Sequence, residues 1–122
     1  MTREEYAARP RRESLAKRLG KVARQIHARD GHACRYCGAT AQTSGAALQL
    51  DHLTPRAAGG LDNPANLVVA CRRCNAARQD RSLAAWIAYA TELGLALRVS
   101  TAAQVRGLAR RRLPELPARR AA

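Results

Sequence analysis

Two pairs of closely spaced cysteines constrain this chain more than any other feature of its sequence. Each pair has the spacing C-x-x-C, with Cys34 and Cys37 in the first pair and Cys71 and Cys74 in the second. One such turn presents two thiolates on the same side, and two turns complete the tetrahedral sulfur shell of a structural zinc ion. The sequence therefore predicts a four-cysteine zinc site whose ligand positions are all filled by protein.

Two alternatives compete with this zinc site: a pair of disulfides, and a site in which His32 is a ligand. The N-terminus MTREEY is polar and lacks the apolar segment of a secretory signal, and no apolar run reaches membrane-spanning length. We therefore expect a cytoplasmic protein without a membrane partner, and a reducing cytosol favours metal over disulfides. Because four thiolates already complete a tetrahedron, His32 is not needed.

The chain has too few large apolar side chains to build a sizeable core. It has 122 residues, with three Tyr, one Trp and no Phe. A structural metal is one of the standard ways to stabilise such a small domain. We expect a flexible arm over residues 1–11, a single domain over 12–100 and an Arg-rich, partly disordered tail over 101–122.

Hydrophobic periodicity predicts a small number of helices and strands. Apolar residues recur three or four apart over 12–29 and over 75–94, which favours helices. The alternation of apolar and polar residues at 48–51 and the apolar segment at 67–70 favour strands. Segments 39–46 and 54–64 contain small, polar, Gly or Pro residues that are typical of loops. Residues 104–113 could form a short basic helix.

The charge balance points to a polyanionic partner. Lys and Arg number 22 against nine Asp and Glu, which gives a formal net charge of +13. Arg can bind phosphate through two parallel hydrogen bonds, and nucleic acid is the commonest partner of so basic a protein. A compositional bias with merely solvated charges is the alternative. We expect DNA as the partner.

Three polar residues near the cysteine pairs could form a second, open site. Asp51 offers a carboxylate oxygen to a divalent cation, and Asn75 adds an amide oxygen from the residue after Cys74. His52 is a residue type that can accept a proton from water near neutral pH. A cation with open positions beside such a base suits the hydrolysis of phosphodiesters.

In this order, the segments CRYCG, LDHLTPRAAGG, NPANL and CRRCNAAR resemble an HNH endonuclease of the subgroup that carries a four-cysteine zinc site. The resemblance covers residues 31–80. It implies an α+β protein with a small ββα-metal fold, in which two antiparallel strands and a helix surround one catalytic divalent metal. A helix before this unit and a basic extension after it would complete the chain.

The resemblance also implies roles for individual residues. His52 would be the general base, and Asp51 and Asn75 would hold the catalytic Mg2+ or Mn2+. Asn66 would be the middle Asn of the motif, which holds the loop and orients the histidine, although Asn63 competes for that position. Asn75 stands where the motif's final residue is His, a replacement that is common in the subgroup and compatible with oxygen ligation.

The function that follows is metal-dependent DNA cleavage, and the alternative is a non-catalytic, zinc-stabilised DNA-binding module. Nicking and double-strand cutting, the oligomeric state and the biological setting stay open. No separate specificity domain is visible, so targeting could come from a partner protein. The expected DNA contacts are seven arginines: Arg56, Arg72, Arg73, Arg78, Arg110, Arg111 and Arg112. In the family that the chain resembles, a Lys is frequent at the position of Arg78.

Overall fold

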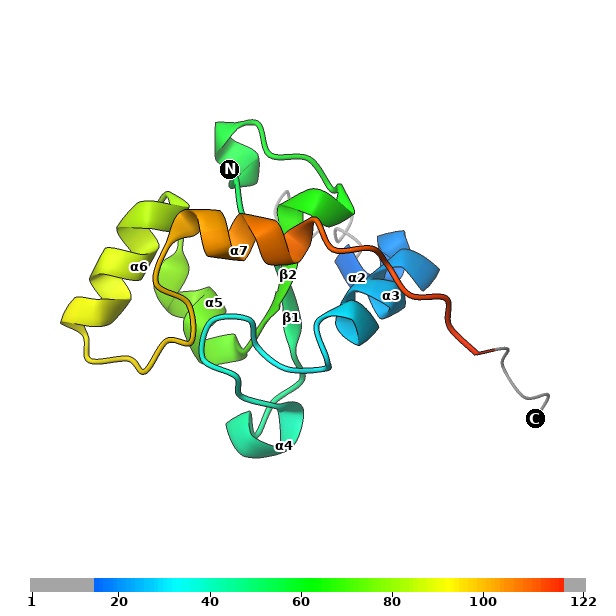
Figure 1. The fold of residues 1–122 in the computed structure, drawn as a ribbon, viewed down its shortest axis with the longest axis horizontal. Helices are drawn as coiled ribbons and strands as arrows, with labels where there is room; N and C mark the ends of the chain where they lie inside the picture. Colours follow the sequence, from blue (N-terminus) through cyan, green and yellow to red (C-terminus); the bar gives the residue numbers. More distant parts are fainter. Residues whose placement is uncertain (1–14, 118–122) are drawn as a thin grey trace, which may run out of the picture.

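A two-stranded sheet lies at the centre of the structure, and helices cover it on both sides (Figure 1). The structure is a computed structural model, and it describes residues 15–117. No helix in that range is long and apolar enough to cross a membrane. The elements are α2 (Leu15–Leu19), α3 (Lys21–Arg29), α4 (Ala41–Ser44), β1 (Gln49–His52), η1 (Arg56–Ala58), η2 (Pro64–Asn66), β2 (Leu67–Ala70), α5 (Arg72–Arg78), α6 (Leu83–Glu92) and α7 (Ala102–Ala109).

The strands β1 and β2 are antiparallel, and α5 follows β2 directly, so the expected ββα unit is confirmed. The register pairs Gln49 with Ala70 and His52 with Leu67. The end of β1 therefore lies beside the start of β2, and the backbone N–H of Leu53 continues the pairing to the carbonyl of Asn66 at 2.8 Å. This end of the sheet carries His52 and the loop that connects the strands.

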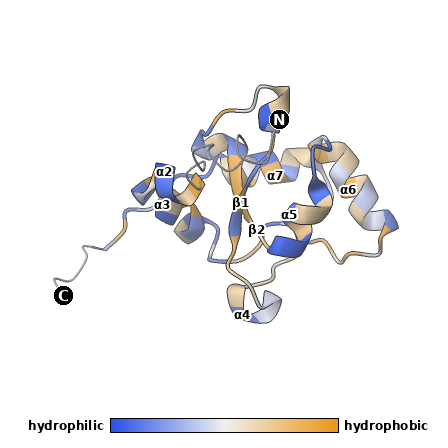
Figure 2. Ribbon diagram, turned by 180° about the vertical axis from the view of Figure 1, so that it is seen from behind, coloured by the Kyte–Doolittle hydropathy of each residue, from blue (hydrophilic) through white to orange (hydrophobic). Residues whose placement is uncertain are grey.

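Strand β2 is buried on both of its faces, which divides the interior into two cores. Val68 and Ala70 pack into the larger core, which contains Trp86 and the paired cysteines. Leu67 and Val69 point the other way and pack against Ile26 of α3. Alternate residues of a strand point to opposite faces, so this one short strand joins both cores. Figure 2 shows hydrophobic colour on β2 and hydrophilic colour on part of β1 and on much of α3 and α5.

A buried ion pair connects α3 to the strands and to α7. The Arg29 guanidinium donates to the Asp30 carboxylate at 2.8 Å and to the carbonyls of Leu67 at 2.6 Å and Ala109 at 2.8 Å. Asp30 in turn accepts the backbone N–H of Val69 at 2.9 Å. Every charge of this pair is compensated, as burial of ions requires.

The two long helices expected from periodicity are each divided into two. The helix predicted over 12–29 is broken at Gly20, where φ is +52°, and its first residues lie outside the described range. The helix predicted over 75–94 is broken at Gln79, where φ is +51°, and Ser82 caps the second part. A positive φ ends an α-helix, and this conformation is rare for a residue other than Gly.

The expected domain boundary at residue 100 is not where the folded unit ends. Helix α7 begins at a capping box formed by Thr101 and Gln104, and its Val105 and Ala109 are buried in the larger core. The sequence suggests an Arg-rich tail here because charges dominate the segment. Two buried apolar residues four apart are enough to dock the helix, so the domain extends at least to Ala109.

Candidate functional site: a zinc centre and a histidine-lined hollow

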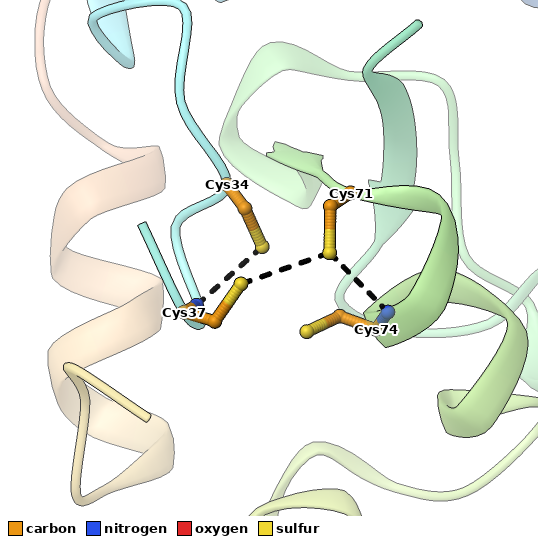
Figure 3. Close-up of side chains that lie close together, drawn as sticks. All are labelled: Cys34, Cys37, Cys71 and Cys74. Carbon is orange, nitrogen blue, oxygen red and sulfur yellow. Dashed lines mark hydrogen bonds between the residues drawn. The ribbon is translucent and has the colours of Figure 1, made fainter. Parts of the chain in front are cut away.

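The four cysteines lie together, as their spacing predicts (Figure 3). Their Sγ atoms all lie within 4.8 Å of one another, and those of Cys37 and Cys71 are 3.7 Å apart. Zn–S bonds of about 2.3 Å in a tetrahedron place sulfurs roughly 3.8 Å apart, so the donor set fits zinc. The cysteines are free rather than disulfide-bonded. The competing ligand His32 is not part of this group, and its ring stacks on His27.

Hydrogen bonds within the cluster favour one thiolate, that of Cys34, whereas burial raises the pKa of Cys71. The bond from Cys74 lowers the pKa of Cys34 to about 4, and the same interaction raises the pKa of Cys74, so the two sulfurs share one proton. The backbone N–H groups of Cys37 and Cys74 point at the Sγ atoms of Cys34 and Cys71, at 3.5 Å and 3.4 Å. These contacts stabilise the charge that a metal requires of its sulfur ligands.

Asp51 is held by two buried partners at the centre of the ββα unit. Its Oδ2 accepts the hydroxyl of Tyr36 at 2.5 Å and Nη1 of Arg78 at 2.5 Å. Burial raises the pKa of Tyr36 well above its usual value, with the Asp51 charge as the next cause, so the phenol stays protonated and donates. Among the described residues no hydrogen bond uses the other oxygen, Oδ1, which leaves it open to a cation.

His52 lies on the rim of a hollow of about 230 Å3 that Asp51, Arg56, Gln79 and Asp80 also line. Its ring nitrogen Nε2 is 2.8 Å from Oδ1 of Asp62, a residue of the loop between the strands. The hollow therefore brings together a carboxylate, an imidazole and an exposed arginine, which are the groups that a phosphodiester and an attacking water require.

The side chain of Asn66 holds the loop between the strands at three points. Its Oδ1 accepts the backbone N–H of Thr54 at 2.8 Å, while its Nδ2 donates to the carbonyls of Thr54 at 3.1 Å and Leu61 at 2.9 Å. Asn63, the competing candidate, only caps η2 by accepting the N–H of Ala65 at 2.9 Å. The geometry thus favours Asn66 for the loop-holding role.

Asn75 lies in α5, but it does not line the hollow shared by Asp51 and His52. Its Nδ2 donates to Oε1 of Gln49 at 2.6 Å. This orientation leaves Oδ1 of Asn75 without a hydrogen bond among the described residues. A carboxylate oxygen and an amide oxygen are ligand types that suit a hard divalent cation such as Mg2+, but the structure does not place Asn75 in the hollow that Asp51 lines.

The predicted DNA contacts divide into exposed arginines and one buried arginine. Arg78 is only 1% exposed, and its guanidinium donates to Asp51, Tyr36 and the carbonyls of His52 and Leu53, so we withdraw it from the expected DNA contacts. The others are exposed. Arg72 and Arg73 line a second hollow of about 530 Å3, which Arg98 and two of the four cysteines also line. Arg110, Arg111 and Arg112 follow the end of α7.

Several residues of the site are not evident from the sequence. Asp62 lies ten positions after His52 in an irregular loop, and no periodicity or motif connects the two. Tyr36 lies between the two cysteines of the first pair, where the sequence gives no sign that it contacts Asp51. Arg98 crosses over the turn at Gly38 so closely that a Cβ there would collide with its guanidinium. In the sequence, the only sign of this contact is the glycine at position 38, directly after the first cysteine pair.

Part of this chain is similar in sequence to known proteins. The sequence model of the family described as "HNH endonuclease" matches residues 34–81, which span both cysteine pairs and the strands between them. The CRISPR-associated endonuclease Cas9 of Actinomyces naeslundii is 42% identical over 57 residues, which make up 46% of this chain and 5% of that protein.

A crystal structure of the Type II-C Cas9 enzyme from the same organism matches with a TM-score of 0.49 and 26% identity, over 92% of this chain and 14% of that one. The chain thus spans only a small part of the length of either relative. The family match itself runs from the first residue of the four-cysteine cluster to the end of α5 and slightly beyond it. Residues 34–81 of this chain form an HNH endonuclease domain.

Proposed function

We propose that this protein is a metal-dependent endonuclease that hydrolyses phosphodiester bonds of DNA. The observation that carries the proposal is that Asp51 and His52 line one hollow at the end of β1, inside the HNH endonuclease domain. The formal net charge of +13 supports a polyanionic substrate. The matched Cas9 is itself named an endonuclease, which is consistent with this activity.

The residues of the hollow have distinct tasks in this proposal. His52 is the general base that takes a proton from the attacking water. Arg56 is exposed on the rim and binds a phosphate oxygen of the substrate. Asn66 holds the loop that follows His52, so the imidazole keeps its place when DNA binds.

A divalent cation such as Mg2+ or Mn2+, held by Oδ1 of Asp51 and Oδ1 of Asn75, would neutralise negative charge on the phosphate and its leaving oxygen. The four-cysteine zinc ion has a structural role, because its protein ligands leave no open position. Removal of each metal should therefore have a different effect, on cleavage for the first and on folding for the second.

The test is conversion of supercoiled plasmid by zinc-loaded protein, with and without added Mg2+ or Mn2+. We expect nicked or linear DNA only with added metal, and a loss of roughly 10²–10⁴-fold in rate for His52→Ala. The matched control is His27→Gln, because His27 does not line the hollow. Zinc content and circular dichroism should match wild type in both variants.

The outcome also separates the two candidate functions. Cleavage by His52→Ala at the wild-type rate would exclude the assigned base. Plasmid that is bound tightly but never cut, at any metal concentration, would instead favour a zinc-stabilised DNA-binding module. The ratio of nicked to linear product would further show whether one domain cuts one strand or both.

A further inference from the structure

Asp62 bridges the proposed catalytic histidine and the N-terminal helix α2. One of its carboxylate oxygens, Oδ1, lies 2.8 Å from Nε2 of His52, and the other, Oδ2, lies 3.2 Å from Nη2 of Arg18. The hydrogen bond with His52 lowers the pKa of Asp62, and the nearby charges of Arg18 and Arg56 act in the same direction. Asp62 is therefore an anion that can only accept hydrogen bonds at neutral pH.

A carboxylate acceptor at this position determines which nitrogen of a neutral imidazole carries the hydrogen. The neutral ring has one N–H, and the tautomer follows from the partner of each nitrogen. Because ionised Asp62 cannot donate, Nε2 of His52 must carry the hydrogen to make the 2.8 Å contact. The lone pair that could accept a proton is then on Nδ1.

The ion pair between Arg18 and Asp62 adds little to the stability of the fold, which suggests that it has another role. The side chains of Arg18 and Asp62 are 35% and 25% exposed. Ion pairs at such exposure contribute little to stability, because solvent screens them. A carboxylate held between a surface arginine and the imidazole of a nuclease site is better explained by its effect on the imidazole.

We propose that Asp62 is a positioning residue that fixes His52 in the Nε2–H tautomer and so makes Nδ1 the proton acceptor, and that Arg18 orients Asp62 for this task. The chemical consequence rests on the proposed nuclease function, whereas the tautomer does not. In the hydrolytic step, a water proton passes to Nδ1, and the water oxygen forms a bond to phosphorus. The bond from phosphorus to the leaving oxygen breaks, and that oxygen keeps the electron pair and takes a proton from solvent.

The imidazolium formed in this step carries an N–H on both nitrogens, and its charge faces the Asp62 carboxylate. The other charged groups near the ring are Asp51, Arg56 and Asp80, which line the hollow. Of these, none has a hydrogen bond to His52 within the described residues. Asp62 is thus the group whose replacement changes the imidazole directly.

The test is the ¹⁵N NMR spectrum of the imidazoles in the full chain without DNA, recorded at alkaline pH. The His52 signals are identified by their disappearance in His52→Gln. We expect wild-type His52 as the Nε2–H tautomer. In Asp62→Asn the amide can donate to Nε2, so we expect the Nδ1–H tautomer to appear, while Asp62→Glu keeps the wild-type form. A hydrogen on Nδ1 in the wild type, or an unchanged tautomer in Asp62→Asn, would overturn the proposal.

The control variant is Asp80→Asn, which removes a carboxylate charge from the hollow that His52 lines but removes no hydrogen bond of His52, and it should leave the tautomer unchanged. In the plasmid assay, Asp62→Asn should lower kcat about 10–100-fold with KM nearly constant, and Asp62→Glu should recover most of that activity. If wild type itself cuts no DNA, the proposed function fails, but the NMR experiment still decides the tautomer. A variant that does not fold is recognised by its zinc content, and the wild-type tautomer then still tests the proposal, because a hydrogen on Nδ1 would overturn it.

Discussion

Nη1 of Arg78 and Oδ2 of Asp51 lie 2.5 Å apart and are both shielded from solvent, so the central helix and the first strand of the ββα unit are joined by a buried ion pair. The same guanidinium also donates to the carbonyls of His52 and Leu53, at the end of that strand. Arg78 therefore fixes the backbone on which the proposed base is mounted. The sequence suggests that Arg78 contacts phosphate, but the side chain is buried and has a structural role instead.

Replacement of Arg78 should lower the stability of the folded protein and not only its affinity for DNA. Arg78→Ala leaves the Asp51 carboxylate buried without its cation, and breaking such a pair costs about 3–5 kcal/mol. Denaturant unfolding measures this decrease in stability. Arg72→Ala is the control, since Arg72 is exposed at the start of the same helix, and it should change stability by less than about 0.5 kcal/mol. A stable Arg78→Ala with reduced DNA affinity would restore the phosphate role.

Zinc should be required for the fold. We expect one tightly bound zinc per chain by mass spectrometry, and disruption of most tertiary structure in Cys74→Ser, because Cys74 is fully buried in the larger core. The apparent binding free energy of such sites is about 10–16 kcal/mol, which exceeds the stability of a typical small domain. Chelation of zinc from wild type should give the same result. Full thermal stability of the metal-free protein would contradict the assignment.

The two candidate asparagines of the loop between the strands can be separated by a matched pair of substitutions. Asn66→Ala removes three hydrogen bonds that close the loop after His52, so we expect cleavage to fall by about 100-fold, as misplaced catalytic groups commonly cause. Asn63→Ala removes only one hydrogen bond within η2 and should stay within a few-fold of wild type. The opposite order of effects would assign the role to Asn63.

Gly60 offers an independent check of the same loop. A Cβ at this position would collide with the carbonyl oxygen of Thr54, which Nδ2 of Asn66 also contacts. Gly60→Ala must therefore displace the loop, and we expect it to reduce cleavage as Asn66→Ala does while zinc content is unchanged. A Gly60→Ala enzyme with wild-type activity would show that the loop's closed form is not required.

The basic segment after α7 should be tested by charge replacement rather than by deletion. Removing residues 104–122 would also remove Val105 and Ala109 from the core, so such a protein would not keep its fold. Substitution of Arg110, Arg111 and Arg112 by Gln spares the core, because all three are exposed. The slope of log affinity for DNA against log salt should become shallower by about 0.9 for each phosphate that the protein no longer neutralises. An unchanged slope would remove this segment from the DNA surface.

The sequence is most informative where the chemistry of a residue type leaves few choices. Two C-x-x-C pairs have few uses other than metal binding and disulfides, and the four sulfurs do lie together. The apolar segment 67–70 is β2 with the predicted bounds, because four consecutive apolar residues fit a strand buried on both faces. The helix breaks at Gly20 and Gln79 could not be predicted, since apolar spacing continues across each break and only the backbone angle reveals it.

Burial of charged residues is the main property that the sequence does not show. Arg78 and the exposed Arg72 lie six positions apart in an equally basic segment, and only the tertiary contacts to Asp51 and Tyr36 distinguish them. Asp62 likewise contacts His52 only because an irregular loop brings the two residues together. Side-chain contacts across loops depend on the whole fold, whereas the cysteine spacing depends on one turn.

The burial of both faces of β2 has a consequence for how this chain could be shortened. Leu67 and Val69 need Ile26 from before the family segment, while Val68 and Ala70 share their core with Trp86 and Val105 from after it. A fragment limited to residues 34–81 would keep every zinc ligand and every proposed catalytic residue, yet it would expose both faces of its own second strand. The minimal catalytic motif and the minimal autonomous folding unit are therefore different lengths of the same chain, and any transplant of this activity must carry the larger one.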